Sequence, residues 1–202
     1  MPADKHEVRK QRWQEIIRAE DLPATRIELL QRFVRENPSS GVAWYRLGRE
    51  LSELSRFDDA EQALHKSIEF SPDSKHLFIF CAMGKLFGYS GDDATAEQWF
   101  RKAISHSPDD AQGYIYLGGM LARLGRLDEA EEVHRRGTHC KTGCIDEAFL
   151  NLGYVLRAKE RYAEAFGCFD RALAIDPKYK EARVARRDVG RVLKLRRGGR
   201  KG

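Results

Sequence analysis

Four side chains near the middle of the chain could bind a metal ion. His134, His139, Cys140 and Cys144 supply nitrogen and sulfur donors, and zinc takes four such ligands in a tetrahedral site. A structural zinc site usually combines one cysteine pair with a second pair of similar spacing, whereas His134 lies more than one helical turn before His139. We therefore interpret this segment as an irregular turn with free thiols, and we expect no metal and no cofactor.

No other part of the chain has the spacing of a catalytic site. Cys81 and Cys168 are interpreted as small buried apolar side chains, because no histidine recurs at a spacing that would activate either thiol. The sequence contains no G-x-S-x-G, no H-E-x-x-H and no glycine-rich phosphate loop. The chain is therefore not expected to be an enzyme.

Positive charge is concentrated at the C-terminal end. From Lys180 onward there are ten Lys and Arg residues and two acids, a net charge of +8, and subtracting this from the chain's +5 leaves −3 for the rest. Such a tail could neutralise phosphates of nucleic acid or of an anionic membrane surface, although it has no aromatic residues for stacking on bases. The cations that we assign to it are Arg186, Arg187, Arg191, Lys194, Arg196 and Arg197.

Composition indicates a cytoplasmic protein without a membrane span. Apolar residues make up 42% and charged residues 33% of the chain. No stretch approaches the roughly 18–20 unbroken apolar residues of a spanning helix. The first residues have no apolar core of a secretory signal, and four unevenly spaced cysteines do not form a disulfide framework. We expect a monomer or a weak homo-oligomer.

The elements that carry these residues repeat along the chain. Self-similarity at a fixed period indicates a repeat architecture, and five columns keep one register with spacings of 36, 34 and 35 residues. The columns are Gly48, Gly84, Gly118, Gly153; Ala60, Ala96, Ala130, Ala165; Trp44, Phe80, Tyr114, Phe149; Leu47, Met83, Leu117, Leu152; and Leu51, Phe87, Leu121, Leu156.

Each copy is predicted to be a hairpin of two helices. Apolar residues at i, i+3, i+4 and i+7 form one face of a helix. Gly48 and Ala60 are small enough to let the two helices approach closely, and copies must stack because one hairpin cannot bury its apolar face alone. Capping boxes are predicted to begin the second helix of two repeats, at Asp58 with Glu61 and at Asp128 with Glu131. Prolines are predicted to end the second helix of three repeats, at Pro72, Pro108 and Pro177.

This pattern resembles the tetratricopeptide-repeat (TPR) family, whose signature is W-x2-L-G-x2-Y…A-x3-F…P at a 34-residue period. The resemblance covers roughly residues 41–179, and it implies an all-α, right-handed superhelical solenoid of antiparallel hairpins whose concave groove binds peptides or proteins. The two most complete copies are Trp44-x2-Leu47-Gly48-x2-Leu51…Ala60-x3-Leu64…Pro72 and Phe149-x2-Leu152-Gly153-x2-Leu156…Ala165-x3-Phe169…Pro177.

The register divides the chain into six segments. In order these are a degenerate N-terminal hairpin or cap (1–40), four repeats (41–74, 77–110, 111–144 and 146–179), and a basic capping helix and tail (180–202). In the third repeat His134 replaces a large apolar residue and Thr142 replaces proline, so we expect its second helix to run on or fray. The capping helix is expected to pack through Ala182, Val184, Ala185, Val189, Val192 and Leu193.

The predicted binding groove is lined by the first helix of each hairpin. It presents cations among aromatic side chains, and aromatics and arginine dominate binding hot spots. We therefore predict a scaffold or adaptor that binds a protein segment of acidic character with apolar anchors. The alternatives are a nucleic-acid- or membrane-surface-associated protein that uses the basic tail, and a regulatory module of a larger enzyme system. The groove residues are Tyr45, Arg49, Phe78, Lys85, Tyr89, Arg123, Tyr154 and Arg157, with Cys81, Ile115 and Leu150 on the same face.

Overall fold

The protein is described by a computed structural model that covers residues 5–18 and 23–198. Within these ranges there are eleven α-helices and one short 3-10 helix, and the β-structure consists of a single isolated bridge between Asp110 and Thr142. The chain divides into two compact units, residues 1–96 and 97–202, and the division falls inside α6 (Asp93–His106). The predicted all-α fold is confirmed, and each unit is described separately.

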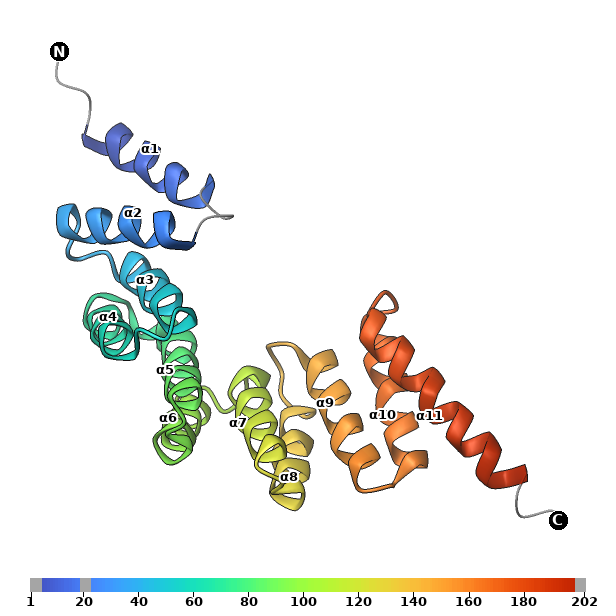
Figure 1. The fold of residues 1–202 in the computed structure, drawn as a ribbon. Coiled ribbons are helices and arrows are strands. Elements are labelled where there is room, and N and C mark those ends of the chain that lie inside the picture. The colour runs from blue at the N-terminus through green and yellow to red at the C-terminus, as the bar shows by residue number, and fades with distance from the viewer. Residues whose placement is uncertain (1–4, 19–22, 199–202) are drawn as a thin grey trace. The chain divides into compact units, whose positions relative to one another are not determined.

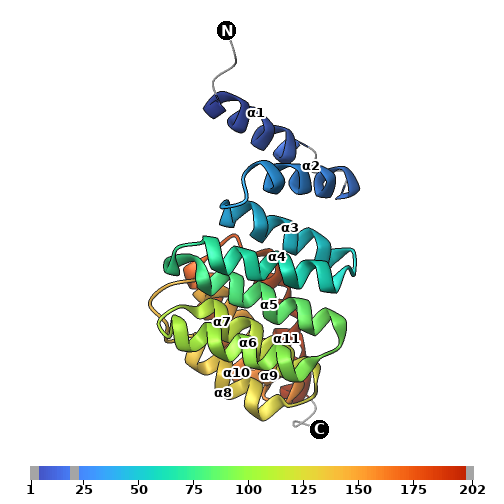
Figure 2. The same ribbon diagram turned by 90° about the vertical axis from the view of Figure 1, so that its left-hand side faces the viewer.

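The N-terminal unit is a series of hairpins (Figure 1). Its neighbours in sequence pack together, α1 on α2, α2 on α3, α3 on α4, and α4 on α5. A short turn at residues 54–56 joins α3 to α4, which lie side by side in both views (Figure 2). The elements are α1 (Lys5–Arg18), α2 (Pro23–Glu36), α3 (Gly41–Glu53), α4 (Phe57–Phe70), the 3-10 turn (Asp73–Lys75) and α5 (His76–Ser90).

In the C-terminal unit, which begins at residue 97 within α6, helices that are neighbours in sequence also pack together. Here α7 packs on α8, α8 on α9, α9 on α10 and α10 on α11, while α7 also contacts α9. The elements are α7 (Ala111–Arg123), α8 (Leu127–Gly137), α9 (Ile145–Ala158), α10 (Tyr162–Ile175) and α11 (Lys180–Gly198).

Close helix crossings explain the glycine column. A Cβ atom added to Gly48 would lie 2.7 Å from Cγ of Leu64 and 3.1 Å from the carbonyl oxygen of Ala60. Cβ atoms are essentially never found within 3 Å of another non-bonded heavy atom, so any larger residue at this position would push α3 away from α4. The packing role predicted for Gly48 and Ala60 is therefore confirmed.

The aromatic column also fixes the start of two hairpins. The Trp44 indole N–H donates to the carbonyl oxygen of Pro38 at 2.7 Å, and the Tyr114 hydroxyl donates to that of Pro108 at 3.1 Å. In both cases the acceptor lies six residues earlier, in the loop that precedes the helix. The polar end of each ring therefore ties its helix to that loop.

The predicted capping boxes are wrong. α4 begins at Phe57 and α8 at Leu127, with Arg56 and Arg126 as N-cap residues that make no side-chain cap. Asp58 and Asp128 therefore lie one residue inside the first turn, where a negative charge favours the helix through its dipole rather than by capping. The chain enters helical geometry earlier than the sequence pattern indicates.

The second helix of the third repeat ends early instead of running on. α8 stops at Gly137, and the loop after it folds back on the preceding inter-repeat loop. The amides of Lys141 and Thr142 donate to the carbonyl oxygen of Asp109 at 2.9 and 3.1 Å, and the Ala111 amide donates to that of Thr142 at 3.0 Å. These hydrogen bonds hold the chain in place after the helix end, where the other repeats have a proline.

Candidate functional site

The predicted groove residues are divided between the two units. Five of them lie in the N-terminal unit, on α3 and α5, and three lie in the C-terminal unit, on α7 and α9. The N-terminal five, which we call the α3/α5 face, are Tyr45, Arg49, Phe78, Lys85 and Tyr89; the other three are Arg123, Tyr154 and Arg157.

Tyr45 and Arg49 line a cavity of about 320 Å³, the Tyr45 cavity. The Arg49 guanidinium lies 5.8 Å from the centre of the Tyr45 ring and 3.9 Å from Glu53. Burial raises the pKa of the Tyr45 phenol above its usual value, so its hydroxyl remains a hydrogen-bond donor at neutral pH. These two predicted residues therefore lie together at a formed recess.

The walls of the Tyr45 cavity come from the N-terminal hairpin. Ile16 and Ile17 of α1 and Leu30 of α2 supply apolar surface, and Ile17 is 40% exposed. The sequence offered a signal for this contribution, the apolar stripe on α1, but the register alone did not connect it with Tyr45.

Positive charge predominates in this cavity. Among the lining residues that the structure describes are three arginines, Arg26, Arg46 and Arg49, and one carboxylate, Glu50. Arg26 is paired with Glu50 at 2.5 Å, and the Arg46 guanidinium lies 4.9 Å from the centre of the Trp13 ring. The cavity therefore favours an anionic group next to an apolar one.

The α5 part of the face carries two exposed aromatic side chains. Phe78 is 47% and Tyr89 56% exposed, at opposite ends of the helix, and Lys85 Nζ lies 5.9 Å from the centre of the Tyr89 ring. Eleven residues of helix separate the two rings, which is a rise of about 16 Å. A bound chain could therefore contact both rings along one helix.

The C-terminal part of the predicted groove is less cationic. Arg157 lies 5.0 Å from the centre of the Tyr154 ring, which meets Phe169 edge-on. Burial raises the pKa of Glu147, and burial together with the Glu147 and Asp146 carboxylates raises the pKa of Tyr179 to about 12. Acidic groups therefore stand among the predicted binding residues of this unit.

Three residues placed on the groove face are instead buried. Cys81, Ile115 and Leu150 are almost inaccessible to solvent. Ile115 packs with Ala111 of its own helix and Ala148 of α9, so this position lies in the seam between successive first helices. The exposed face is accordingly narrower than the sequence register suggested.

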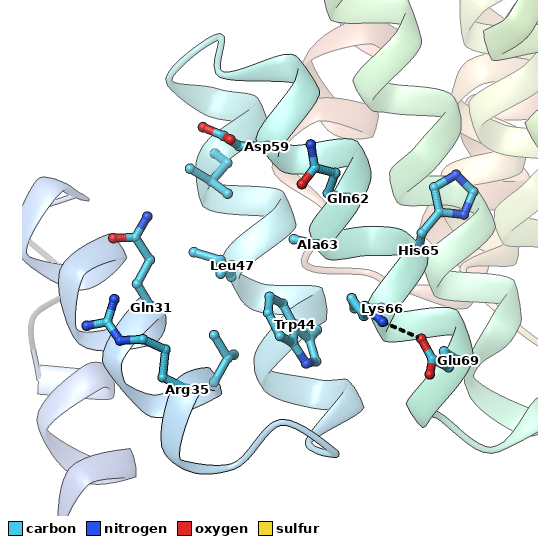
Figure 3. A pocket seen from close by; sticks show the side chains of 12 residues that line it. Gln31, Arg35, Trp44, Leu47, Asp59, Gln62, Ala63, His65, Lys66 and Glu69 are labelled. Atoms are coloured by element: carbon cyan, nitrogen blue, oxygen red, sulfur yellow. Dashed lines mark hydrogen bonds and ion pairs between the residues drawn. The ribbon is translucent and has the colours of Figure 1, made fainter.

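A larger cavity of about 650 Å³, the Trp44 cavity, lies between α2 and α4 (Figure 3). Its apolar lining is centred on the Trp44 indole, and polar side chains of α2 and α4 approach it from the two sides. No sequence signal predicted it, because it depends on the separation of two helices. The lining residues are Gln31, Val34, Arg35, Trp44, Leu47, Leu51, Asp59, Gln62, Ala63, His65, Lys66 and Glu69.

The cations of the predicted basic tail have two different roles. Arg186 is paired with Asp170 and lies 4.7 Å from the centre of the Phe166 ring. Arg196 is paired with Glu160 at 3.0 Å and lies 4.4 Å from the centre of the Tyr162 ring. Both therefore attach α11 to the preceding hairpin.

Three other tail cations lie on the exposed side of α11. Arg187 and Arg191 are 3.6 and 3.8 Å from the Asp188 carboxylate, and Lys194 is exposed. The side chain of Arg197 lies outside the described residues. These three cations are therefore accessible to a partner, in contrast to Arg186 and Arg196.

The His and Cys segment forms an ordered loop. Nδ1 of His139 lies 2.7 Å from the carbonyl oxygen of Arg135, while His134 is buried inside the α7/α8 hairpin. Burial raises the pKa of the Cys140 and Cys144 thiols, with Asp110 and Glu147 adding to the effect respectively. In the part of the chain that the structure describes, no three His, Cys, Asp or Glu side chains gather as metal ligands would.

The described helices include none that is both long and apolar enough to cross a membrane.

Comparison with known proteins gives a consistent result. Three segments, residues 42–74, 81–138 and 146–179, match family models described as tetratricopeptide repeat. The human protein O-mannosyl-transferase TMTC1 is 26% identical over 137 residues, which is 68% of this chain and 15% of that protein. The chain thus spans only a small part of the curated relatives it matches.

Two solved structures share the fold. TTC0263, a thermophilic TPR protein from Thermus thermophilus, superposes with a TM-score of 0.68 at 18% identity over 90% of this chain and 98% of that one. YrrB, described as a TPR protein with an unusual peptide-binding site, gives a TM-score of 0.56 at 19% identity over 86% and 88%. Identities this low establish the architecture and leave the ligand open.

Proposed function

Since the chain belongs to the tetratricopeptide-repeat family, we propose that it is a protein-interaction scaffold whose α3/α5 face holds a segment of another protein. The family fold generally mediates protein–protein interaction. The ligand proposed for this chain is an extended segment with at least one carboxylate and with apolar side chains beside it.

The composition of the Tyr45 cavity is the observation that carries this proposal. It has a volume of about 320 Å³, enough for one or two side chains, and its arginines outnumber its one described carboxylate. Arginine binds carboxylates through paired hydrogen bonds, and the exposed part of Ile17 offers an adjacent apolar contact. An aspartate, a glutamate or a terminal carboxylate next to an apolar residue fits this chemistry.

The exposed rings of α5 give the ligand its length. Phe78 and Tyr89 are about 16 Å apart along the helix, a distance that about five residues of extended chain would cover. Large aromatic side chains are typical anchors at protein interfaces. A segment that fills the Tyr45 cavity and then follows α5 would therefore meet one charged and two aromatic contacts.

Affinity capture from lysate, followed by mass spectrometry, tests the proposal. The baits are the full chain, the Tyr45→Ala/Arg49→Glu variant, and a chain that ends at Tyr179. We expect a defined protein partner that is retained without the tail at moderate salt and is lost with the double variant. The double variant must keep its helical circular dichroism. Retention of the same partner by that variant would reject the α3/α5 face as the binding site.

The similarity to TMTC1 does not extend that protein's named activity to this chain. The matched region is 68% of this chain and only 15% of TMTC1. The second candidate function is that of a repeat module that regulates a larger enzyme system. This function also requires the α3/α5 face to bind a protein segment. The capture experiment separates the two by whether the partner is an enzyme.

A further inference from the structure

α11 lies at the position of the first helix of a fifth hairpin. α9 begins at Ile145 and α11 at Lys180, which continues the 35-residue spacing of the repeat. Position by position, the residues of α9 that pack against α10 correspond to exposed or charged residues of α11. The correspondence is Phe149 with Val184, Leu152 with Arg187, Gly153 with Asp188, and Leu156 with Arg191.

One side of α11 is fully used by the hairpin before it. Ala182, Ala185 and Val189 are buried in one cluster with Phe169 and Ala172 of α10. The expectation that Val184 joins this contact is wrong, since it is 47% exposed and points the other way around the helix. α11 therefore has a packed face and a separate outer face.

The outer face of α11 combines apolar and cationic side chains. At 100° per residue, Lys180, Val184, Arg187, Arg191 and Leu195 fall within one sector of about 80°. Leu195 is 76% exposed, and the three cations are also exposed. Three cations with two apolar side chains beside them form a surface suited to an acidic partner with an apolar stripe.

We propose that the outer face of α11 binds an acidic amphipathic helix of a partner protein, placed where the second helix of a fifth hairpin would lie. This surface is separate from the α3/α5 face, and either one can bind without the other. The apolar stripe of the partner would cover Val184 and Leu195, and its carboxylates would pair with Lys180, Arg187 and Arg191.

Asp188 determines how close that helix can come. In the α9/α10 hairpin the equivalent Gly153 lets the Phe169 ring pack directly on the helix backbone. A carboxylate at this position keeps the backbone of a partner helix farther away, so contacts with Val184 and Leu195 require long apolar side chains on the partner. Arginine side chains are long enough to bridge the added distance to carboxylates, which explains why cations replace leucines here.

The same observations favour a protein helix over nucleic acid. α11 has no aromatic residue on which bases could stack. Its exposed apolar side chains, Val184 and Leu195, would make no favourable contact with phosphates but can pack on the apolar stripe of a helix. Nucleic acid is therefore an outcome for the test to exclude.

The proposal can be tested on the full chain by selecting binders from a displayed library of helical peptides. Each peptide is about 18 residues long, so that it can form a helix in water. Binders are selected on the unmodified protein and measured by fluorescence anisotropy at physiological salt. We expect enriched peptides with Asp or Glu at i, i+3 and i+4 beside an apolar stripe. Arg187→Glu/Arg191→Glu should weaken their binding at least about tenfold, because it replaces attraction by repulsion at two positions.

Three further variants serve as controls. Arg32→Glu/Lys66→Glu makes the same charge change on exposed positions of α2 and α4, and it should leave binding within about twofold. Arg187→Gln/Arg191→Gln, which removes charge without reversing it, should give an intermediate loss. Tyr45→Ala/Arg49→Glu should have no effect, so failure here is distinguishable from failure of the α3/α5 proposal.

The proposal is overturned by any of three results. One is that no acidic helix is enriched. Another is that enriched peptides bind the Arg187→Glu/Arg191→Glu variant as well as the unmodified chain. The third is that binding of labelled duplex DNA of about 20 base pairs, or of phosphatidylserine vesicles, requires Arg187 and Arg191 while binding of every peptide does not.

Discussion

The spaces between second helices differ between the two units. In the C-terminal unit, Nη1 of Arg161 at the start of α10 donates to both carboxylate oxygens of Glu131 on α8, at 2.7 and 2.6 Å. Arg126 at the start of α8 reaches Glu97 on α6 in the same way, at 2.6 Å. An arginine at the helix start therefore joins each second helix to the one before it.

Among the described residues of the N-terminal unit this connection is not found, although its hairpins follow the same pattern. Arg56 holds the equivalent position but binds Asp59 of its own helix at 2.5 Å, and the matching place on α2 is taken by Ile27. At the start of α6 the residue is Asp92, which accepts from the Thr95 amide at 3.0 Å and so caps its own helix. The Trp44 cavity lies in the space between α2 and α4, where the part of the chain that the structure describes has no such arginine–glutamate pair.

This difference shows that the apolar columns specify hairpins, while a single column of charges decides how firmly neighbouring hairpins are joined. Glu131 is nearly buried and accepts from Lys159, Arg135 and Arg161. Although burial acts to raise its pKa, these three cations lower it to about 2. We expect the C-terminal joints to be stiffer and the N-terminal ones to adapt to ligands.

The largest expected effect concerns His134, which sits where the α3/α4 hairpin has Leu64. Its Nδ1 is buried with no hydrogen-bond partner among the described residues, and burial lowers its pKa to about 4. Since this is below the ordinary 6.5, folding stability is complete above about pH 6.5 and falls as the pH drops toward 4, by about 3 kcal/mol. His134→Leu should abolish this loss in urea unfolding at pH 7 and pH 4.

The α3/α4 hairpin of the other unit is the control for His134. It has Leu64, which cannot be protonated, at the equivalent position. Hydrogen exchange at pH 4 should show faster opening in α7 and α8 than in α3 and α4. Equal acid sensitivity of the two hairpins would remove His134 as its cause.

The next effect tests the ion cluster itself. Glu131→Gln keeps the shape but leaves Arg161, Lys159 and Arg135 without their shared carboxylate, and we expect a loss of about 2 kcal/mol in the free energy of unfolding at pH 7. Because the Glu131 pKa lies below its usual 4.5, this contribution is present above about pH 4.5 and disappears as the pH falls toward 2. Urea denaturation of the variant and the unmodified chain across this pH range measures both the loss at pH 7 and its pH dependence. A variant that is equally stable at pH 7 would contradict the assigned role.

The smallest effect compares two arginines at the same repeat position. Arg161→Ala should lower the urea midpoint of unfolding more than Arg56→Ala does, because Arg161 pairs with a carboxylate of another helix, whereas Arg56 forms an exposed pair within its own helix. The urea midpoints of the two variants, measured side by side, provide the test. Equal losses would show that the second-helix joints of both units are held by other contacts.

Much of the fold could be predicted from the sequence, because the columns of small and large apolar residues determine which helix faces meet. Helix starts could not, since whether Arg56 or Asp58 precedes the first turn depends on backbone geometry rather than on residue type. The Tyr45 cavity was predicted only in part. Tyr45 and Arg49 follow from the register, but Ile16 and Ile17 reach them through the packing of α1, which no repeat spacing specifies.

The residues that form the ion pairs between second helices recur in the sequence, but their pairing was not predicted. Arg126 and Arg161 are 35 residues apart, and Glu97 and Glu131 are 34 apart, so both charges recur with the repeat. Charged residues are ordinarily interpreted as solvated surface, and only the structure shows that the N-cap residue of one second helix approaches the middle of the preceding second helix.

The ring-to-loop hydrogen bonds of Trp44 and Tyr114 have a consequence for the order of folding. Each closes a loop of only six residues, which costs little chain entropy, and each helix pair is then completed by contacts within the next few turns. Contacts of such short range permit rapid nucleation, so the first and third repeats can each start folding without waiting for the rest of the chain. Folding is therefore expected to begin at two sites and to spread outward from both.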